Sequence, residues 1–326
     1  VYTLSIGIRK MGIKESFLAE RRVLLAGNGI SDAQKISWND MLSYVQEKLT
    51  QKDKTLESEK IEEINNISPT LFFESLCKKS ADQNKTEKEL RSLVKEYVGD
   101  KSNFVHKLWN IYNVILTTNF DNNLVISKAD MIENDEDPKE KHLTYENNLQ
   151  FRRLDFIYDK IQKSIFFIHG YFKNPSTICL GYEQYTENLN KIENFVVQKY
   201  SEKNYKNKTE NKSVSWIDYF FKENTTIDIL GLSLCDEEID IWWILNYRKK
   251  ILQRIKNNTI NYYDIPVDCI EDNSVKAKRT AKQKILESFG INVVQIEKAK
   301  KYNSDFYSLC LKKIKEEIKK YILEEL

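Results

Sequence analysis

Short apolar runs that alternate with longer helical patterns constrain this chain more than any other feature. Each run has the length of a strand, consists largely of Val, Ile, Leu, Phe and Tyr, and ends in small or polar residues. Strands are expected at 23–26, 114–116, 165–168, 177–181, 226–233, 261–267 and 292–296. Strands that alternate with helices build a mainly parallel sheet with helices on both faces. The sequence therefore predicts the α/β fold class.

The expected architecture is a Rossmann-like sheet domain over 21–297 with a helical insertion at about 50–112. A helix is expected over 1–22. A segment at about 201–213 is dense in Lys, Asn and Glu, which predicts an exposed mobile loop. The last segment, 298–326, predicts a C-terminal helix with apolar residues at a spacing of four, which favours docking on the helix's own core over an oligomer contact.

Composition excludes several classes of protein. Lys and Arg number 51 against 49 Asp and Glu, and the lysines are scattered, so nothing in the sequence indicates a nucleic-acid partner. No apolar run reaches the roughly 18–20 residues of a membrane span. The 5 cysteines are widely spaced, and no secretory leader is evident. Both features predict reduced thiols in a cytoplasm.

Two polar strings mark the carboxyl ends of two expected strands. Thr117–Asp121 follows the run at 114–116, and His169–Gly170 follows the run at 165–168. Open α/β sheets bind ligands at the carboxyl ends of their strands. Gly27–Ser31 and Gly231–Ser233 end two more strands in the same way. We expect all four strings to line one nucleotide-sized crevice.

Each string has a functional and a structural interpretation. A Gly-x-Gly turn lets the backbone approach a pyrophosphate closely, but it also makes a tight turn without a ligand. His169 at a strand end can accept a proton near pH 7, or it can be a structural histidine. The Asn119 amide can hold a water or a sugar hydroxyl. Asp121 can accept a hydrogen bond from a ligand, or it can cap the following helix.

Taken together and in this order, the four strings resemble motifs of the sirtuin family, in particular the bacterial sirtuin-like NADases of antiphage defence. The resemblance covers 21–297. Gly27–Ser31 is similar to the family's Gly-Ala-Gly-x-Ser turn, and Thr117–Asp121 to its Thr-x-Asn-x-Asp motif. His169–Gly170 resembles the catalytic His-Gly. Gly231–Ser233, with Asp236 and Ile239 after it, resembles the Gly-x-Ser-x-x-Asp-x-x-Ile pattern of the bacterial branch.

Three departures from the family pattern matter. Asn28 replaces the usual Ala beside the phosphates, and Leu232 replaces the Thr that is common in protein deacylases. The family's four-cysteine zinc module is absent, since only Cys179 lies between His169 and Gly231. A structural zinc needs about four Cys or His ligands, so we expect no zinc. In deacylases that module helps to form the acyl-lysine cleft, so its loss favours water as the acceptor.

The resemblance implies a stand-alone NADase that hydrolyses NAD to nicotinamide and ADP-ribose, or to a cyclised form, and so depletes NAD in abortive infection. It implies Asn119 and His169 as catalytic residues, with no metal. Asp121 would bind the carboxamide of nicotinamide. The residues implied to bind NAD are Gly27, Asn28, Gly29, Ser31, Thr118, Asp121, Gly231, Ser233 and Asp236.

Three alternatives remain: an NAD-dependent lysine deacylase, a non-catalytic sensor of NAD or ADP-ribose, and a scaffold within an oligomer. The branch that the chain resembles is commonly oligomeric or works with a partner such as a HerA-type ATPase or an Argonaute-like protein. After Ile296 about one long helix remains, which favours a stand-alone subunit over a fused version. The first residue is Val1 rather than Met, which leaves open a processed, trimmed or alternatively started chain and a domain of a larger protein.

Overall fold

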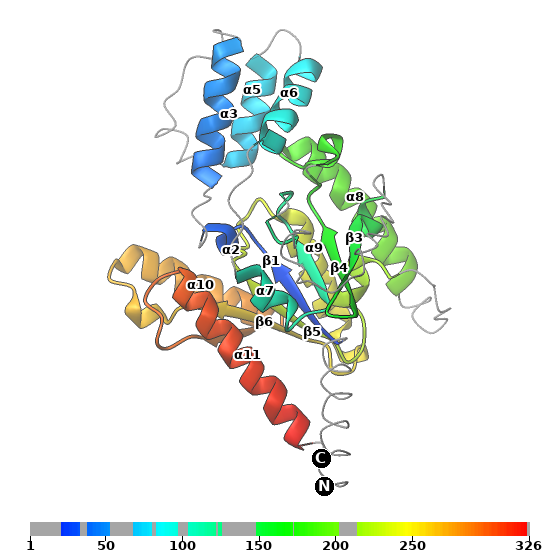
Figure 1. The fold of residues 1–326 in the computed structure, drawn as a ribbon, viewed down its shortest axis with the longest axis vertical. Coiled ribbons are helices and arrows are strands. Elements are labelled where there is room, and N and C mark those ends of the chain that lie inside the picture. Colours follow the sequence, from blue (N-terminus) through cyan, green and yellow to red (C-terminus); the bar gives the residue numbers. More distant parts are fainter. Residues whose placement is uncertain are drawn as a thin grey trace.

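A seven-stranded sheet lies at the centre of the fold (Figure 1). The structure is a computed structural model that describes residues 21–32, 38–52, 68–79, 83–96, 104–121, 123–125, 148–171, 173–201 and 214–324. The strands are β1 (Arg22–Ala26), β2 (Val114–Thr117), β3 (Arg153–Tyr158), β4 (Ile161–Phe167), β5 (Thr226–Leu230), β6 (Thr259–Asp264) and β7 (Asn292–Gln295). Every neighbouring pair is parallel except β3–β4. The predicted α/β class with a mainly parallel sheet is confirmed.

The strand order is β3-β4-β2-β1-β5-β6-β7. Apart from the antiparallel edge strand β3, the chain runs outward from β1 through β2 to β4, and then returns to the other side of β1 to form β5, β6 and β7. This is the strand order of doubly wound nucleotide-binding sheets, in which the direction of winding reverses between two central strands. Here the reversal lies between β1 and β5. The ligand crevice of such sheets lies outside the carboxyl ends of the strands at this point.

Helices cover both faces of the sheet, because successive strand residues point to opposite sides. In β1, Val23 and Leu25 belong to one core, and Leu24 and Ala26 belong to the other. The first core includes residues of α8 (Tyr182–Tyr200), α9 (Ile239–Ile251) and α10 (Asn273–Ser288). The second includes residues of α7 (Phe104–Trp109) and α11 (Ser304–Glu324).

Three further helices form a unit above the carboxyl ends of the strands (Figure 1). They are α3 (Trp38–Lys52), α5 (Pro69–Lys79) and α6 (Gln83–Glu96). Their apolar side chains form a third cluster, which also includes Phe120 after β2 and Ile178 and Leu180 after β4. This helical unit therefore packs directly on the ends of the two strands that carry the polar strings. The short helices are α2 (Gly29–Asp32), η3 (Leu149–Phe151), η4 (Pro175–Thr177), η5 (Trp216–Phe220), η6 (Leu252–Arg254) and η7 (Val267–Cys269).

Several expectations can be compared with the described residues. The apolar stripe of α11 docks on the core, as Phe306, Cys310 and Ile314 are all buried there. The prediction of a strand at 177–181 is wrong, because the helix η4 ends at Thr177 and an irregular segment follows it. The helix expected over 1–22 lies outside the described residues apart from its last two positions, and the loop at 201–213 lies outside them apart from its first. Within the described part of the chain, no helix is both long and apolar enough to cross a membrane.

Gly231, directly after β5, is expected to tolerate no side chain. Its φ is +67°, and a Cβ there would lie 2.4 Å from the Ile30 amide nitrogen. We expect Gly231→Ala to lower the free energy of unfolding by about 2 kcal/mol or more, measured by chemical denaturation. Gly290→Ala is the matched control: its φ is +73°, but the nearest contact would be the Leu252 side chain at 3.0 Å. Equal losses in the two variants would contradict a specific backbone clash at Gly231.

Candidate active site

The four predicted strings lie at the ends of four consecutive strands, β4, β2, β1 and β5. In the parallel pair β2–β4, Thr117 is the register partner of Phe167, and the Ile168 amide donates to the Thr117 carbonyl at 2.8 Å. Asn119 and His169 each lie two residues beyond this last pair. The structure therefore brings the two candidate catalytic residues to corresponding positions at one edge of the sheet.

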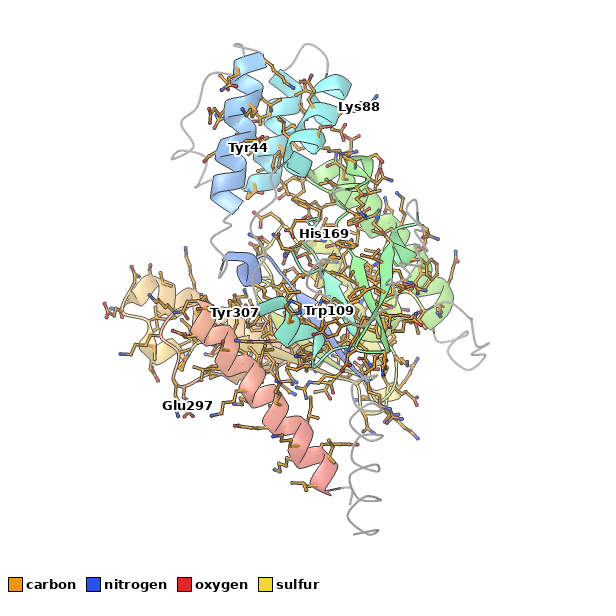
Figure 2. The ribbon with its side chains drawn as sticks, viewed as in Figure 1. Tyr44, Lys88, Trp109, His169, Glu297 and Tyr307 are labelled. Carbon is orange, nitrogen blue, oxygen red and sulfur yellow. The ribbon has the colours of Figure 1, made fainter. Side chains whose placement is uncertain are left out.

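His169 forms a buried pair with Asp240, a residue in the first turn of α9. The imidazole Nε2 lies 3.0 Å from Asp240 Oδ2, and both side chains are almost completely inaccessible to solvent. The other carboxylate oxygen, Oδ1, accepts from the Ile241 amide at 2.8 Å. The Asp240 carboxylate is thus fixed by its own helix while it holds the imidazole. In Figure 2, His169 lies between the sheet and the helical unit.

The second ring nitrogen of His169 faces Tyr185 of α8. The Tyr185 hydroxyl lies 3.4 Å from Nδ1, and the two rings meet edge to face with centroids 5.0 Å apart. Since a carboxylate only accepts hydrogen bonds, Asp240 favours the tautomer that carries its proton on Nε2. The lone pair is then on Nδ1. The nitrogen that can take a proton is the one that points toward Tyr185.

Charged neighbours set the protonation of this pair. Burial is the largest single influence and lowers the pKa of His169, but the charge and the hydrogen bond of Asp240 act with Glu238 in the opposite direction, and the pKa is raised above its ordinary value of 6.5. Glu238 precedes α9, whereas Arg152, which precedes β3, lowers the pKa. Burial also raises the pKa of Glu238 to about 7. Its Oε2 atom is buried without a hydrogen-bond partner among the described residues.

Thr117, two residues before Asn119, orients that residue. Thr117 Oγ1 donates to the Ala26 carbonyl at 3.1 Å and accepts from the Asn119 amide at 3.0 Å. The Asn119 side-chain amide donates to the Gly27 carbonyl at 3.4 Å, and the Thr118 amide donates to the Ala26 carbonyl at 3.2 Å. Asn119 is therefore a buried amide held between β1 and β2, next to the strand that carries His169.

Asp121 makes a local contact with the turn that follows it, and residues 123–125 form no helix that it could cap. Its Oδ1 accepts from the Asn123 amide at 2.7 Å, and burial raises the pKa of its carboxyl to about 6. A carboxyl with this pKa is protonated in part of the molecules near neutral pH. It can accept a hydrogen bond from a ligand amide, but its ionised form is held in an unfavourable environment.

We expect Asp121→Asn to stabilise the protein at pH 8 and not at pH 4. The folded-state pKa of about 6 exceeds the ordinary 3.8, so the folded protein loses stability as pH rises between these values. Asparagine keeps the acceptor for Asn123 and cannot ionise. The expected gain above pH 6 is about 1–3 kcal/mol, measured by denaturation at both pH values. Asp236→Asn, at an exposed carboxylate, is the control; equal gains in both variants would contradict the assignment.

The glycine turn after β1 packs against protein. The Gly27 amide donates to the Leu230 carbonyl at 3.0 Å, and the Gly29 amide donates to the Gly231 carbonyl at 2.8 Å. A Cβ on Gly27 would lie 2.4 Å from Gly231 O. The close approach that these glycines permit is between the ends of β1 and β5. These two amides bond within the protein, which agrees with the alternative of a tight turn and leaves neither amide to bind a pyrophosphate.

The remaining candidate residues have varied surroundings. Asn28 is half-buried, whereas Ser233 and Asp236 are exposed after β5. The side chain of Ser31 lies outside the described residues. Asp240 and Tyr185 were missed from the sequence. Asp240 had one local signal: it is an acidic residue that directly follows Ile239 of the resembling pattern, and the five residues after it, 241–245, are all apolar.

Among the residues that the structure describes, no group of three or more His, Cys, Asp and Glu side chains could hold a metal ion. All five cysteines are unpaired thiols. No protein-family model matches the chain, and no curated protein matches it significantly.

Proposed function

We propose that this protein hydrolyses the bond between nicotinamide and ribose in NAD, with His169 as the base. One observation carries the proposal: a buried histidine paired with a buried carboxylate follows β4, an interior strand of a doubly wound sheet, and Asn119 follows the neighbouring strand β2. A nucleotide crevice is expected at this edge. The motif resemblance supplies the identity of the nucleotide.

The chemistry requires one base and one positioned acceptor. The bond from C1′ of the ribose to the nicotinamide nitrogen breaks, and its electron pair leaves with the ring. A water oxygen bonds to C1′, and its proton passes to Nδ1 of His169. The buried Asp240 carboxylate then stabilises the imidazolium. Asn119 holds the water or a ribose hydroxyl, and Asp121 accepts from the nicotinamide carboxamide.

The same sheet edge supplies the groups for the rest of the nucleotide. The turn at Gly27 and Gly29 contributes shape, because its amides are bonded within the protein. The polar side chain of Asn28 and the exposed Ser233 and Asp236 are the groups left to contact the phosphates and the adenosine ribose. Thr118, Ser31 and Gly231 complete the lining that we propose.

The test of this function is incubation of the purified protein with NAD, with and without an acetyl-lysine peptide. We expect nicotinamide and ADP-ribose, linear or cyclised, in both reactions. Peptide-dependent formation of acetyl-ADP-ribose would instead indicate a deacylase. Binding of NAD by calorimetry without turnover would indicate a sensor, and absence of binding would indicate a scaffold.

The motif resemblance also suggests the biological process in which the protein acts. We propose cytoplasmic NAD depletion during phage infection, by a homo-oligomer or by a complex with a HerA-type ATPase or another defence protein. NAD measured in infected cells that express the parent or His169→Ala tests this setting. A fall in NAD of the same size in both cultures would contradict it. Light scattering tests assembly, and a monomer that is fully active without any partner would contradict the oligomer.

A further inference from the structure

We propose that Tyr185 is a positioning residue that occupies the base nitrogen of His169 in the resting protein, and that the helical unit holds Tyr185 there through the first turn of α8. The assignment of a base rests on the proposed function. The contact itself and its link to the helical unit stand on geometry alone.

The Tyr185 hydroxyl is placed to act as a donor. It lies 3.4 Å from Nδ1, the ring nitrogen opposite the Asp240 contact. Burial raises the pKa of Tyr185 well above 10, and Cys179 and Asp240 raise it further, so the hydroxyl keeps its proton. A distance of 3.4 Å is long for a hydrogen bond and corresponds to a weak one. A substrate water can therefore displace the hydroxyl, and must do so before Nδ1 can take a proton.

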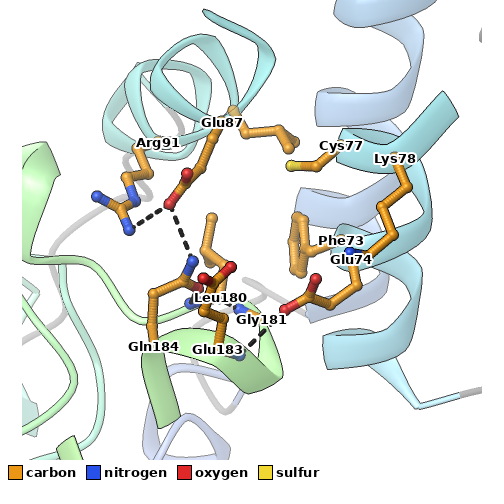
Figure 3. Close-up of a pocket in the computed structure, with 11 residues that line it drawn as sticks. Phe73, Glu74, Cys77, Lys78, Glu87, Arg91, Leu180, Gly181, Glu183 and Gln184 are labelled. Atoms are coloured by element: carbon orange, nitrogen blue, oxygen red, sulfur yellow. Dashed lines mark hydrogen bonds and ion pairs between the residues drawn. The ribbon is translucent and has the colours of Figure 1, made fainter. Parts of the chain in front are cut away.

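The helical unit holds the turn of α8 that carries Tyr185 (Figure 3). The Glu183 amide donates to Glu74 of α5 at 3.1 Å. The Gln184 side chain donates to Glu87 of α6 at 2.9 Å and accepts from the Gly181 amide at 2.6 Å. Residues 183, 184 and 185 thus bond in succession to α5, to α6 and to His169. These bonds flank a hollow between the helical unit and the start of α8.

The Tyr185 amide donates to the Gly181 carbonyl at 3.2 Å, so Tyr185 belongs to the same hydrogen-bonded turn as Glu183 and Gln184. We therefore expect a shift of α5 and α6 on the sheet to shift Tyr185 relative to His169. The groups that set the charge of His169 come from several elements. Asp240 lies in α9 and Glu238 precedes that helix, while Arg152 precedes β3. Tyr185 differs from these three groups because residues 183 and 184, directly before it, bond to the helical unit.

The first test is Tyr185→Phe, which removes the hydroxyl and keeps the ring. A donor to the lone pair favours the neutral imidazole, so its loss is expected to raise the pKa of His169, measured by NMR titration of the protein without NAD. At pH above that pKa, kcat/KM for nicotinamide release is expected to rise about 2–10-fold, the effect of losing one competing hydrogen bond. Tyr158→Phe is the matched control, because it loses one hydroxyl bond, to Asn110, on the β3–β4 hairpin.

The second test is Glu74→Ala, which removes the bond from α5 to the Glu183 amide. It is expected to raise the pKa of His169 in the same direction as Tyr185→Phe. Glu183→Ala is its control, because the variant keeps the backbone amide and changes the same hollow. An unchanged or lowered pKa of His169 in Tyr185→Phe would overturn the positioning role. An unchanged pKa in Glu74→Ala would overturn the coupling. The titration needs no turnover, so it decides both points even if the protein does not cleave NAD.

Discussion

Replacing His169 by alanine is expected to lower nicotinamide release from NAD by about 10²–10⁴-fold, the usual contribution of a positioned base. Among the residues that the structure describes, His169 is the imidazole at this sheet edge that lies beside a carboxylate, and the variant removes it. Initial rates of nicotinamide release at saturating NAD measure the effect. His106→Ala is the control, because His106 lies in α7 rather than at a strand end and its ring contacts Tyr158.

His169 is buried, so a second variant separates chemistry from folding. His169→Gln retains an amide that can donate to Asp240, but it has no basic nitrogen. We expect His169→Gln to have the same loss of rate as His169→Ala with a smaller loss of thermal stability. Turnover of NAD at the parental rate by either variant would contradict the assignment of His169 as the base.

Asp240→Asn is expected to have an effect of similar size for a different reason. Asp240 Oδ1 accepts from the Ile241 amide, which requires an oxygen at that position in the variant. The asparagine amide group then faces Nε2 of His169 and donates to it. The imidazole proton is forced onto Nδ1, and the base nitrogen is lost. Loss of the correct tautomer predicts a decrease of about 10²–10⁴-fold in kcat.

Nitrogen NMR of His169 measures this tautomer directly, and we expect it to invert in Asp240→Asn. Asp218→Asn is the matched control. Asp218 is also a buried carboxylate, but it bonds Lys199, Tyr200 and the Ser215 amide, away from the imidazole. This control is expected to lose stability and keep its rate. An unchanged tautomer in Asp240→Asn would show that the carboxylate does not set it, and a parental rate with an inverted tautomer would contradict Nδ1 as the base.

Strands whose two faces are both buried could be predicted from the sequence alone. Such strands read as continuous apolar runs, and β1, β2, β4 and β5 were predicted on that basis. The edge strand β3 was missed because Arg153 and Asp155 interrupt its apolar residues, whereas the other edge strand, β7, was predicted at 292–296. The apolar residues at 177–181 predicted a strand, but they are apolar because they are buried and not because they pair in the sheet. There Ile178 and Leu180 pack into the helical unit, and a Cβ on Gly170 would lie 2.4 Å from Ile178 Cα.

The candidate site was predictable where neighbouring parallel strands bring residues together. Asn119 and His169 were expected to line one crevice because both follow strands, but the pairing of β2 with β4 that makes these strands neighbours came from the structure. Asp240 lies 71 residues from His169, and their contact depends on how α9 packs. The neighbouring strand sequence also could not show which group the glycines of the turn approach. Gly27 permits close approach of any backbone or phosphate, and its sequence does not say that the neighbour is Gly231.

The most direct test of the central claim is the pH dependence of kcat/KM for nicotinamide release from NAD, measured from about pH 5 to about pH 9. His169 acts as a base only when neutral, and its pKa is raised above 6.5. We therefore expect kcat/KM to rise with pH through a midpoint above 6.5 that equals the NMR pKa of His169 in the protein without NAD. Absence of nicotinamide release across this range, or a rate that does not follow the titration of His169, would contradict the account.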